Sequence, residues 1–236
     1  MAVEACDADG DGKEDDLVSD GLFMGRPIGT IFNYQAGPIY QLNETPMAGF
    51  QTGSLRVVDQ NNDGDITPDD RVFLGQSEPK YRMSLFNTVS YKGFTLSFLL
   101  NSAQGGKDGY LGNNTRSFFR DDNSIRDNDF SDVDYWSPRN PNGKYPFLVD
   151  GNRSKVSPNL YQSRNFVRLQ DVSLGYNLPA KVLEKIKAQA VNVFVSGKNL
   201  ATWTKWEGWD PETGQGFDIG GRPVMRAFSV GLQITY

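Results

Sequence analysis

The sequence predicts an all-β chain whose antiparallel strands run up and down, as in a segment of a transmembrane β-barrel. The first observation behind this prediction is the last expected strand, in which bulky residues alternate with small or polar ones. A period of two puts the bulky residues on one face, which meets a core in a soluble protein and lipid in a membrane barrel. These residues are Phe228, Val230, Leu232, Ile234 and Tyr236.

Two further observations favour the membrane interpretation. The connections between the expected strands alternate between long and short, as they do in outer-membrane barrels. No apolar run approaches the ~20 residues of a membrane helix, whereas a barrel strand needs only ~10 alternating residues. The chain also has 25 glycines and 12% aromatic residues, which suits turn-rich β structure with aromatic girdles.

Six segments are expected to form strands, with one short helix between two of them. The second and third strands are joined by Lys92-Gly93, which is expected to form a tight two-residue turn. Residues 179–188 have a proline at a first-turn position and helical spacing, which predicts the helix. The expected strands are residues 23–34, 81–91, 94–102, 165–177, 191–199 and 226–236.

In the fourth strand, residues 165–177, side chains are assigned to faces by their phase. Val172, Leu174 and Tyr176 share one face of this strand, and Arg168 and Gln170 fall in the same phase. An uninterrupted strand places all five side chains on the same side of a sheet.

The long connections are residues 35–80, 103–164 and 200–225, and they follow the first, third and fifth strands. In a barrel such loops are extracellular and the short turns periplasmic, so we expect the three long loops at one end of the sheet. Six strands cannot close a barrel, for which about eight are needed. The chain is therefore expected to be the C-terminal part of a larger barrel.

Composition excludes several classes of function. The chain has one cysteine and no histidine, which excludes an internal disulfide framework, a zinc cluster and His-based triads. Its net charge is -5 and its basic residues are scattered, so no nucleic-acid partner is expected. The chain opens with no basic-then-apolar signal peptide, so an export signal is expected on a longer parent chain.

The segment from Asp59 to Asp70 has the spacing of a calcium-binding loop. Oxygen donors stand at its positions 1, 3 and 5, Gly64 at position 6 and a carboxylate at position 12. Calcium takes six to eight oxygen ligands, and the glycine permits a sharp turn. The alternative is a solvated turn that holds no metal. The predicted ligands are Asp59, Asn61, Asp63, Asp65 through its carbonyl, Thr67 and Asp70.

A second acidic run, residues 7–15, repeats aspartate at alternate positions but has no carboxylate at position 12. We expect residues 1–20 to form an acidic N-terminal segment that is loop or disordered. Residues 21–236 are then the barrel-forming part of the chain.

Aromatic and acidic residues in the long loops are candidates for ligand contact. Trp136 and Trp209 could stack on a ligand or simply pack within their loops, whereas Trp203 closely follows a strand and suits an interfacial girdle. Asp210 and Glu212 form the acidic pair that a glycosidase would need. Their expected role is instead to fix the last loop by hydrogen bonds, and the chain is not expected to be an enzyme.

Several local motifs occur in one order along the chain. Together they resemble the C-terminal portion of SusC/RagA-type TonB-dependent outer-membrane transporters, from about residue 21 to the end. The signal peptide, plug domain and TonB-contacting segment of that family are not visible here. The motifs are Gly25–Ile31, Asp59–Asp70, Gly75 with Pro79, Tyr91–Phe94, Phe166–Leu169 with Leu174–Pro179, and Asn199–Leu200 with Gly208–Glu212.

The resemblance implies a barrel segment of an outer-membrane importer for oligosaccharides or peptides. It implies four partners: a SusD-like surface lipoprotein as lid, the TonB complex as energy source, outer-membrane lipid, and a glycan or peptide substrate. It also implies that Tyr236 is recognised by the barrel-insertion machinery. The rival is a soluble, secreted calcium-binding β domain that acts as a glycan-binding or adhesive module. Such a domain would cover the apolar strand face with a second layer of its own.

Overall fold

A computed structural model describes residues 15–109, 134–147, 156, 158–216 and 222–236. This part of the chain is mostly antiparallel β-sheet with one α-helix, as predicted. None of its helices has the length and apolar character to cross a bilayer. The acidic run at residues 7–15 lies almost wholly outside the described residues, and a single 3₁₀ turn, η1 (Val18–Asp20), follows it.

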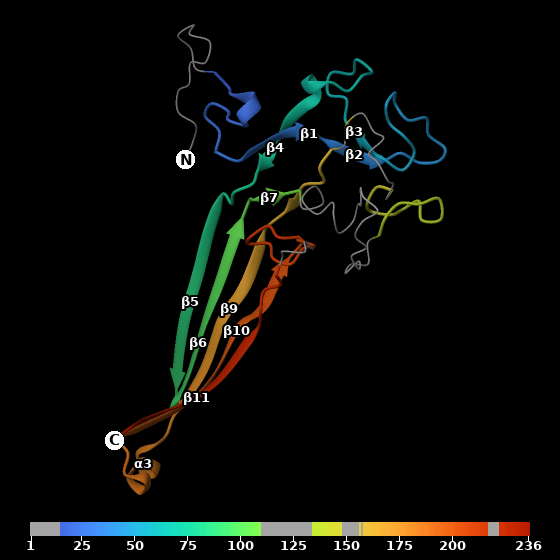
Figure 1. The fold of residues 1–236 in the computed structure, drawn as a ribbon. Helices are drawn as coiled ribbons and strands as arrows, with labels where there is room; N and C mark the ends of the chain where they lie inside the picture. The colour runs from blue at the N-terminus through green and yellow to red at the C-terminus, as the bar shows by residue number, and fades with distance from the viewer. Residues whose placement is uncertain (1–14, 110–133, 148–155, 157, 217–221) are drawn as a thin grey trace, which may run out of the picture.

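A five-stranded sheet forms the long body of the molecule (Figure 1). Its order is β11-β10-β9-β6-β5, so strands that follow one another in the chain lie side by side, and every neighbouring pair is antiparallel. With 9 to 15 residues each, the strands are long enough to cross a bilayer at a tilt. They are β5 (Tyr81–Tyr91), β6 (Phe94–Gln104), β9 (Phe166–Asn177), β10 (Ala190–Thr204) and β11 (Ala227–Thr235).

The short connections lie at one end of this sheet and the long ones at the other (Figure 1). At the short-connection end, Lys92 and Gly93 have φ of 47° and 87°, as a two-residue hairpin turn requires. The helix α3 (Ala180–Ile186) lies at the same end and confirms the predicted helix. The described parts of the three long connections lie together at the opposite end, so their predicted sorting is confirmed.

Small two-stranded sheets occupy the long-connection end. The prediction of a strand over residues 23–34 within the main sheet is wrong, because only its last five residues form a strand and that strand pairs with β4. Gly25 and Gly29 have φ of 68° and 82°, and Pro27 between them has no N–H, so this stretch turns instead of extending. The pairs are β1 (Thr30–Tyr34) with β4 (Arg71–Gln76), β2 (Ala36–Ile39) with β3 (Leu55–Val57), and β7 (Lys107–Asp108) with β8 (Gln162–Ser163).

A β-bulge corrects the face that was assigned to Arg168. The register between β6 and β9 shifts between Leu99 and Leu100, so that Gln170 of β9 is the extra residue. An extra residue exchanges the two faces beyond it. Arg168 therefore lies on the face opposite Val172, aligned with Thr202 of β10.

Below the bulge, two neighbouring rows of side chains run across all five strands on opposite faces. One row is aliphatic throughout, and the next is made of small hydroxyl residues throughout. We call the aliphatic side the outer face and the hydroxyl side the inner face. The aliphatic row is Val89, Leu96, Leu174, Val195 and Val230, and the hydroxyl row is Thr88, Ser97, Ser173, Ser196 and Ser229.

The outer face is not covered by a second layer of the described chain. Val230 is 81% exposed, Phe228 is 73% exposed and Leu85 is 56% exposed. The buried apolar residues lie instead mainly among the loops, where Ile39 and Leu55 pack with Trp136. The described residues thus lack the core that the rival soluble domain would need under this sheet.

Candidate functional site

The outer face is an apolar belt with aromatic residues near both ends. Tyr81 and Trp203 are 56% and 57% exposed near the long-connection end. Tyr91, Phe94 and Tyr236 are 67%, 50% and 79% exposed near the other end. Aromatic girdles at both membrane interfaces are the pattern of outer-membrane barrels, and Trp203 has the position expected of a girdle residue.

Both edges of the sheet are open within the described chain, since β5 and β11 each pair with one neighbour only. An open edge leaves a row of backbone N–H and C=O groups without strand partners. Hydrocarbon does not tolerate such groups, so a sheet in lipid has to continue until it closes.

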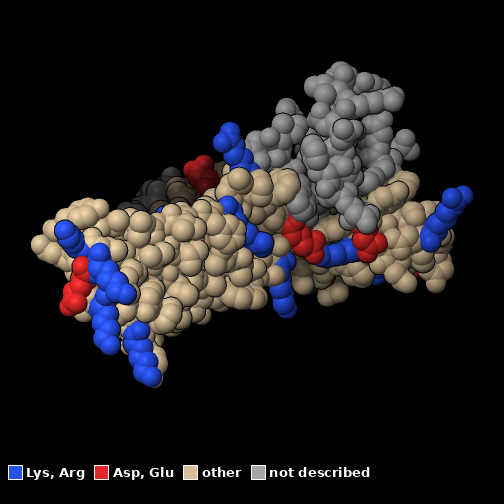
Figure 2. Space-filling model, turned by 90° about the horizontal axis from the view of Figure 1, so that it is seen from below, with Lys and Arg blue, Asp and Glu red and all other residues tan. Residues whose placement is uncertain are grey.

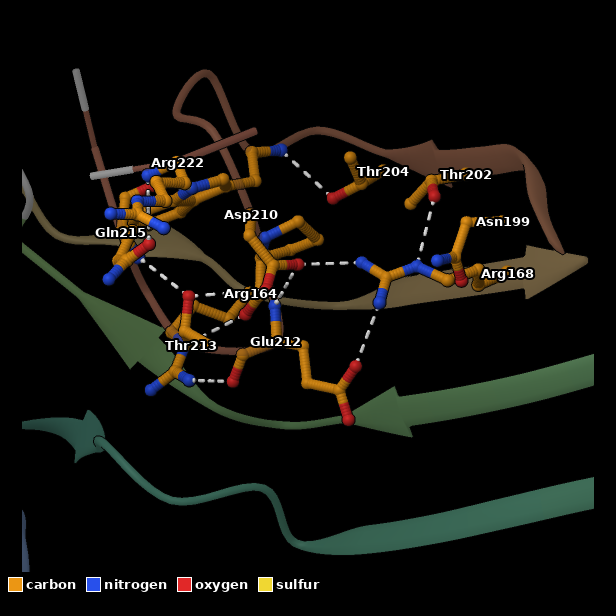
Figure 3. Close-up of polar contacts among 12 residues, drawn as sticks. Arg164, Arg168, Asn199, Thr202, Thr204, Asp210, Glu212, Thr213, Gln215 and Arg222 are labelled. Atoms are coloured by element: carbon orange, nitrogen blue, oxygen red, sulfur yellow. Dashed lines mark hydrogen bonds and ion pairs between the residues drawn. The ribbon is translucent and has the colours of Figure 1, made fainter. Parts of the chain in front are cut away.

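Arg168 is the centre of an ion cluster on the inner face (Figure 3). Its guanidinium is nearly enclosed, with 5% of the residue exposed. Its Nη2 donates to Oδ1 of Asp210 at 2.6 Å, and its Nη1 donates to Oε2 of Glu212 at 2.8 Å. The Nε donates to Oγ1 of Thr202 at 3.1 Å, so every nitrogen of the guanidinium has a partner. A buried arginine with two carboxylates is a rigid attachment point.

A second arginine attaches the same loop through its backbone. The Nε of Arg164 donates to the carbonyl of Pro211 at 3.0 Å, and its Nη2 donates to the carbonyl of Glu212. Asp210 also accepts the backbone N–H of Glu212 at 3.1 Å and the hydroxyl of Thr213 at 3.2 Å. The prediction that Asp210 and Glu212 fix this loop by hydrogen bonds is confirmed.

Sequence reasoning missed both arginines as the partners of this loop. The strand phase had put Arg168 on the outer face, because it assumed an uninterrupted strand. Gln170 and Asp171 are adjacent polar residues that break the alternation. That break was the available signal for the bulge.

Glu207 joins the last long loop to the segment 134–147. It accepts hydrogen bonds from the ammonium of Lys144 and the hydroxyl of Tyr145. Burial acts to raise the pKa of Glu207, but these two hydrogen bonds, the charge of Lys144 and a hydrogen bond from Gln162 together outweigh it and hold the pKa below its usual value. Glu207 is therefore charged at neutral pH and ties the two loops together.

Trp136 is enclosed among the loops, which favours packing over ligand contact, the two roles that the sequence left open for it. Trp136 is 2% exposed, and its Nε1 donates to Oε1 of Gln41 at 2.9 Å. Gly53 lies against it with φ of 86°, and a Cβ there would come within 2.7 Å of the indole. Trp209 is only partly buried, and ligand contact by Trp209 stays a prediction.

The loop from Asp59 to Asp70 is closed by its own carboxylates. The two oxygens of Asp59 accept the backbone N–H groups of Asn62 at 2.7 Å and Gly64 at 2.9 Å. Asp70 is fully buried, and its two oxygens accept the N–H groups of Gln60 and Thr67, both at 2.8 Å. These bonds to Thr67 and Gln60 lower the pKa of Asp70.

The other predicted calcium ligands bond to one another along the turn. Oδ1 of Asn61 accepts the N–H of Asp63 at 3.0 Å, and Oδ1 of Asp63 accepts the N–H of Asp65 at 2.8 Å. Among the described residues, no three acidic or cysteine side chains converge as a metal site would require. A carboxylate oxygen has two lone pairs and can accept an N–H and still ligate a cation, so the donor chemistry fits calcium.

Comparisons with known proteins agree with this geometry. A scan against protein families finds no match. The chain is 30% identical to TonB-dependent receptor P3 of Formosa agariphila over 234 residues, which cover 91% of the chain and 23% of that receptor. It is 29% identical over 198 residues to TonB-dependent receptor P26 of the same organism, covering 78% of the chain and 20% of the receptor.

The chain is homologous to part of the TonB-dependent receptors. Its location is therefore the outer membrane. It spans roughly a quarter of the length of the receptors that it matches, 23% for the P3 receptor.

The fold of this receptor segment is also found in solved structures. It matches the RagAB peptide importer in its open-open state with a TM-score of 0.61 and 18% identity, over 91% of this chain and 23% of that one. It matches another structure of the RagAB peptide transporter with a TM-score of 0.58 and 19% identity, over 87% and 22% of the two chains. At this identity the likeness concerns the fold alone.

The ion cluster predicts a large difference between two arginine substitutions. Arg168→Met leaves the carboxylate of Asp210 buried without its cation, which should destabilise the fold by about 3–5 kcal/mol. Arg82→Met is the matched control, because Arg82 meets Glu212 at 3.5 Å in an exposed pair worth about 0–1 kcal/mol. The measurement is the free energy of unfolding in detergent micelles. Equal losses for the two variants would contradict the role of Arg168.

The Asp70 carboxylate predicts a pH dependence of the 59–70 loop. The folded pKa of Asp70 lies below the unfolded value of 3.8. Its contribution to the stability of the loop is therefore complete above pH 3.8 and is lost as the pH falls through the folded pKa. Amide exchange at Gln60 and Thr67, corrected for intrinsic rates, should lose protection in that range. Asp70→Asn should lose protection already at pH 7, and the exposed Asp69→Asn should not. If these two amides are protected equally in Asp70→Asn and in the unmodified chain, the Asp70 carboxylate does not hold the loop closed.

Proposed function

We propose that this chain is a barrel-forming segment of an outer-membrane importer. It would supply five lipid-facing strands and long extracellular loops that line a ligand vestibule. The observation that carries the proposal is the pair of opposed rows across the sheet. One row is aliphatic on all five strands and exposed, and the next consists of Thr88 and four serines. Water would not stabilise the first of these rows, and lipid would.

The inner face and the loops support a vestibule at the long-connection end. Most side chains of the inner face are small or polar, although Phe86 and Phe194 also lie on it, and the lumen of a transport barrel is polar. The last loop is attached to it through Arg168 and Arg164 and to the segment 134–147 through Glu207. Loops held in this way can present a fixed surface to a ligand.

We propose oligosaccharides or peptides as the imported substrate, taken up by transport and not by catalysis. The similarity to a RagAB peptide importer supports the peptide alternative through the fold. A SusD-like surface lipoprotein would act as the lid over the vestibule. The TonB complex would supply energy through parts of the receptor that these residues do not cover, and Tyr236 would be read by the barrel-insertion machinery.

The outer and inner faces predict opposite outcomes for one substitution at adjacent positions. Val230→Arg should reduce barrel stability by about 2–4 kcal/mol, because it places a charge in the apolar belt. Ser229→Arg puts the same side chain on the inner face and should cost much less. The measurement is the free energy of unfolding from lipid vesicles, together with the amount of receptor in the outer membrane. If Val230→Arg is tolerated as well as Ser229→Arg, the outer face does not meet lipid.

We also propose that the loop from Asp59 to Asp70 takes up calcium. The support is the spacing of its oxygen donors, with glycine at position 6 and a carboxylate at position 12. Asp59, Asn61, Asp63, Thr67 and Asp70 would ligate through side chains and Asp65 through its carbonyl. The cation would rigidify the loop beside β4.

Calcium titration by calorimetry tests this proposal. The expected result is binding with a dissociation constant of about 10⁻⁴–10⁻³ M, the range of extracellular modules. Asp63→Asn removes the donor charge at position 5 and should weaken binding at least tenfold, roughly the effect of 1.4 kcal/mol. Asp69→Asn is the control, since position 11 supplies no ligand. The calcium proposal fails if the unmodified loop gives no binding or if Asp63→Asn binds equally well.

A further inference from the structure

Exposed lysines gather at the end of the sheet that carries the short connections. This end is made of residues 88–97, 172–193 and 227–236. The charged side chains in these three ranges are four lysines and one glutamate. Figure 2 views the molecule from this side and shows basic side chains gathered beside an acidic one. We call them the lysine cluster: Lys92, Lys181, Lys185 and Lys187, with Glu184 among them.

Two of these lysines stand at backbone positions that disfavour them. Lys92 and Lys187 have φ of 47° and 53°, in the left-handed region where glycine or asparagine is usual. The other non-glycine residues with positive φ in the described chain are Asn62 and Asn199, which follow that preference. Lysine at both turns of one end is therefore not explained by the backbone. It indicates that the charged side chain itself has a role there.

Apolar groups border the lysine cluster. Val182 and Ile186 of α3 are 39% and 49% exposed, and their spacing of four residues puts them on one side of the helix. Tyr91 is 67% exposed at the end of the outer face, and the Nζ of Lys92 lies 5.1 Å from the centre of its ring. The outer face therefore passes from aliphatic to aromatic to cationic over a short distance. A bilayer passes from hydrocarbon to interface to headgroup in the same order.

We propose that the lysine cluster binds the anionic headgroups of phospholipids in the leaflet nearest α3, with Val182 and Ile186 set into the interface. This inference rests on the proposed function, in which the outer face meets lipid. Charge complementarity supports it, because four positive charges meet one negative charge at this end. Each lysine near an anionic surface adds an electrostatic attraction. Salt screens this attraction, which falls off over a Debye length of ~10 Å at ~0.1 M.

The test uses the complete receptor that contains this segment, reconstituted in nanodiscs of phosphatidylcholine and phosphatidylglycerol. Native mass spectrometry measures how strongly phosphatidylglycerol is enriched among the lipids that remain bound. Changing the four lysines to glutamine should reduce the enrichment by about fivefold or more, since one lysine alone provides roughly that factor. High salt should reduce it as well. Four Lys→Arg changes keep the charge and should keep the enrichment.

Two further variants separate charge from folding. Lys92→Asn with Lys187→Gly puts the preferred residue at each left-handed position, so the fold should be at least as stable while the enrichment falls. Lys80→Gln with Lys205→Gln removes two exposed lysines at the opposite end and should change nothing. Equal enrichment in the unmodified receptor and the glutamine variant overturns the inference. Failure of the unmodified receptor to enter bilayers of either composition overturns the proposed function instead.

Discussion

The constraint on which the structure depends is that one face of a five-stranded sheet is largely apolar and is not covered by the described part of the chain. On the outer face, the row from Val89 to Val230 is continuous across the sheet. Burial contributes roughly 25 cal/mol per Å² of apolar surface, and a face left in water would forgo that stabilisation. The short strands, the loop core and the ion cluster all lie at one end of the sheet or on its other face. This distribution is understandable if hydrocarbon takes the place of a second protein layer.

The bulge in β9 divides the sheet into two parts with different tasks. Below it, the inner face carries mostly small or polar side chains, with Phe194 among them, and the outer face carries mostly aliphatic and aromatic ones. Above it, the exchanged phase brings Arg168 to the inner face, where Asp210 and Glu212 of the last loop meet it. One extra residue therefore turns Arg168 toward the last long loop, and bulges at the rims of barrels commonly re-aim a side chain in this way.

Much of the sheet could be predicted from the sequence, because a period of two and a two-residue turn are local signals. Five strands, the Lys92-Gly93 turn, the helix and the sorting of the loops follow from such signals. The failures came where tertiary contacts decide. The stretch from Gly25 to Gly29 turns out of the sheet, and Arg168 changes face because of a bulge. The enclosure of Trp136 depends on Gly53, Phe147 and Gln41, which only the fold brings together.

Spin-label accessibility measures directly which medium, lipid or water, each face of β11 meets. After Cys6→Ser, single nitroxide labels are placed at positions 228 to 234 of the receptor in lipid vesicles. Collisions with oxygen, which concentrates in lipid, should peak at 228, 230, 232 and 234, and collisions with a water-soluble nickel chelate should peak between them, as a period of two requires. Even-numbered positions that are shielded from oxygen, or open to the nickel chelate, would contradict the account.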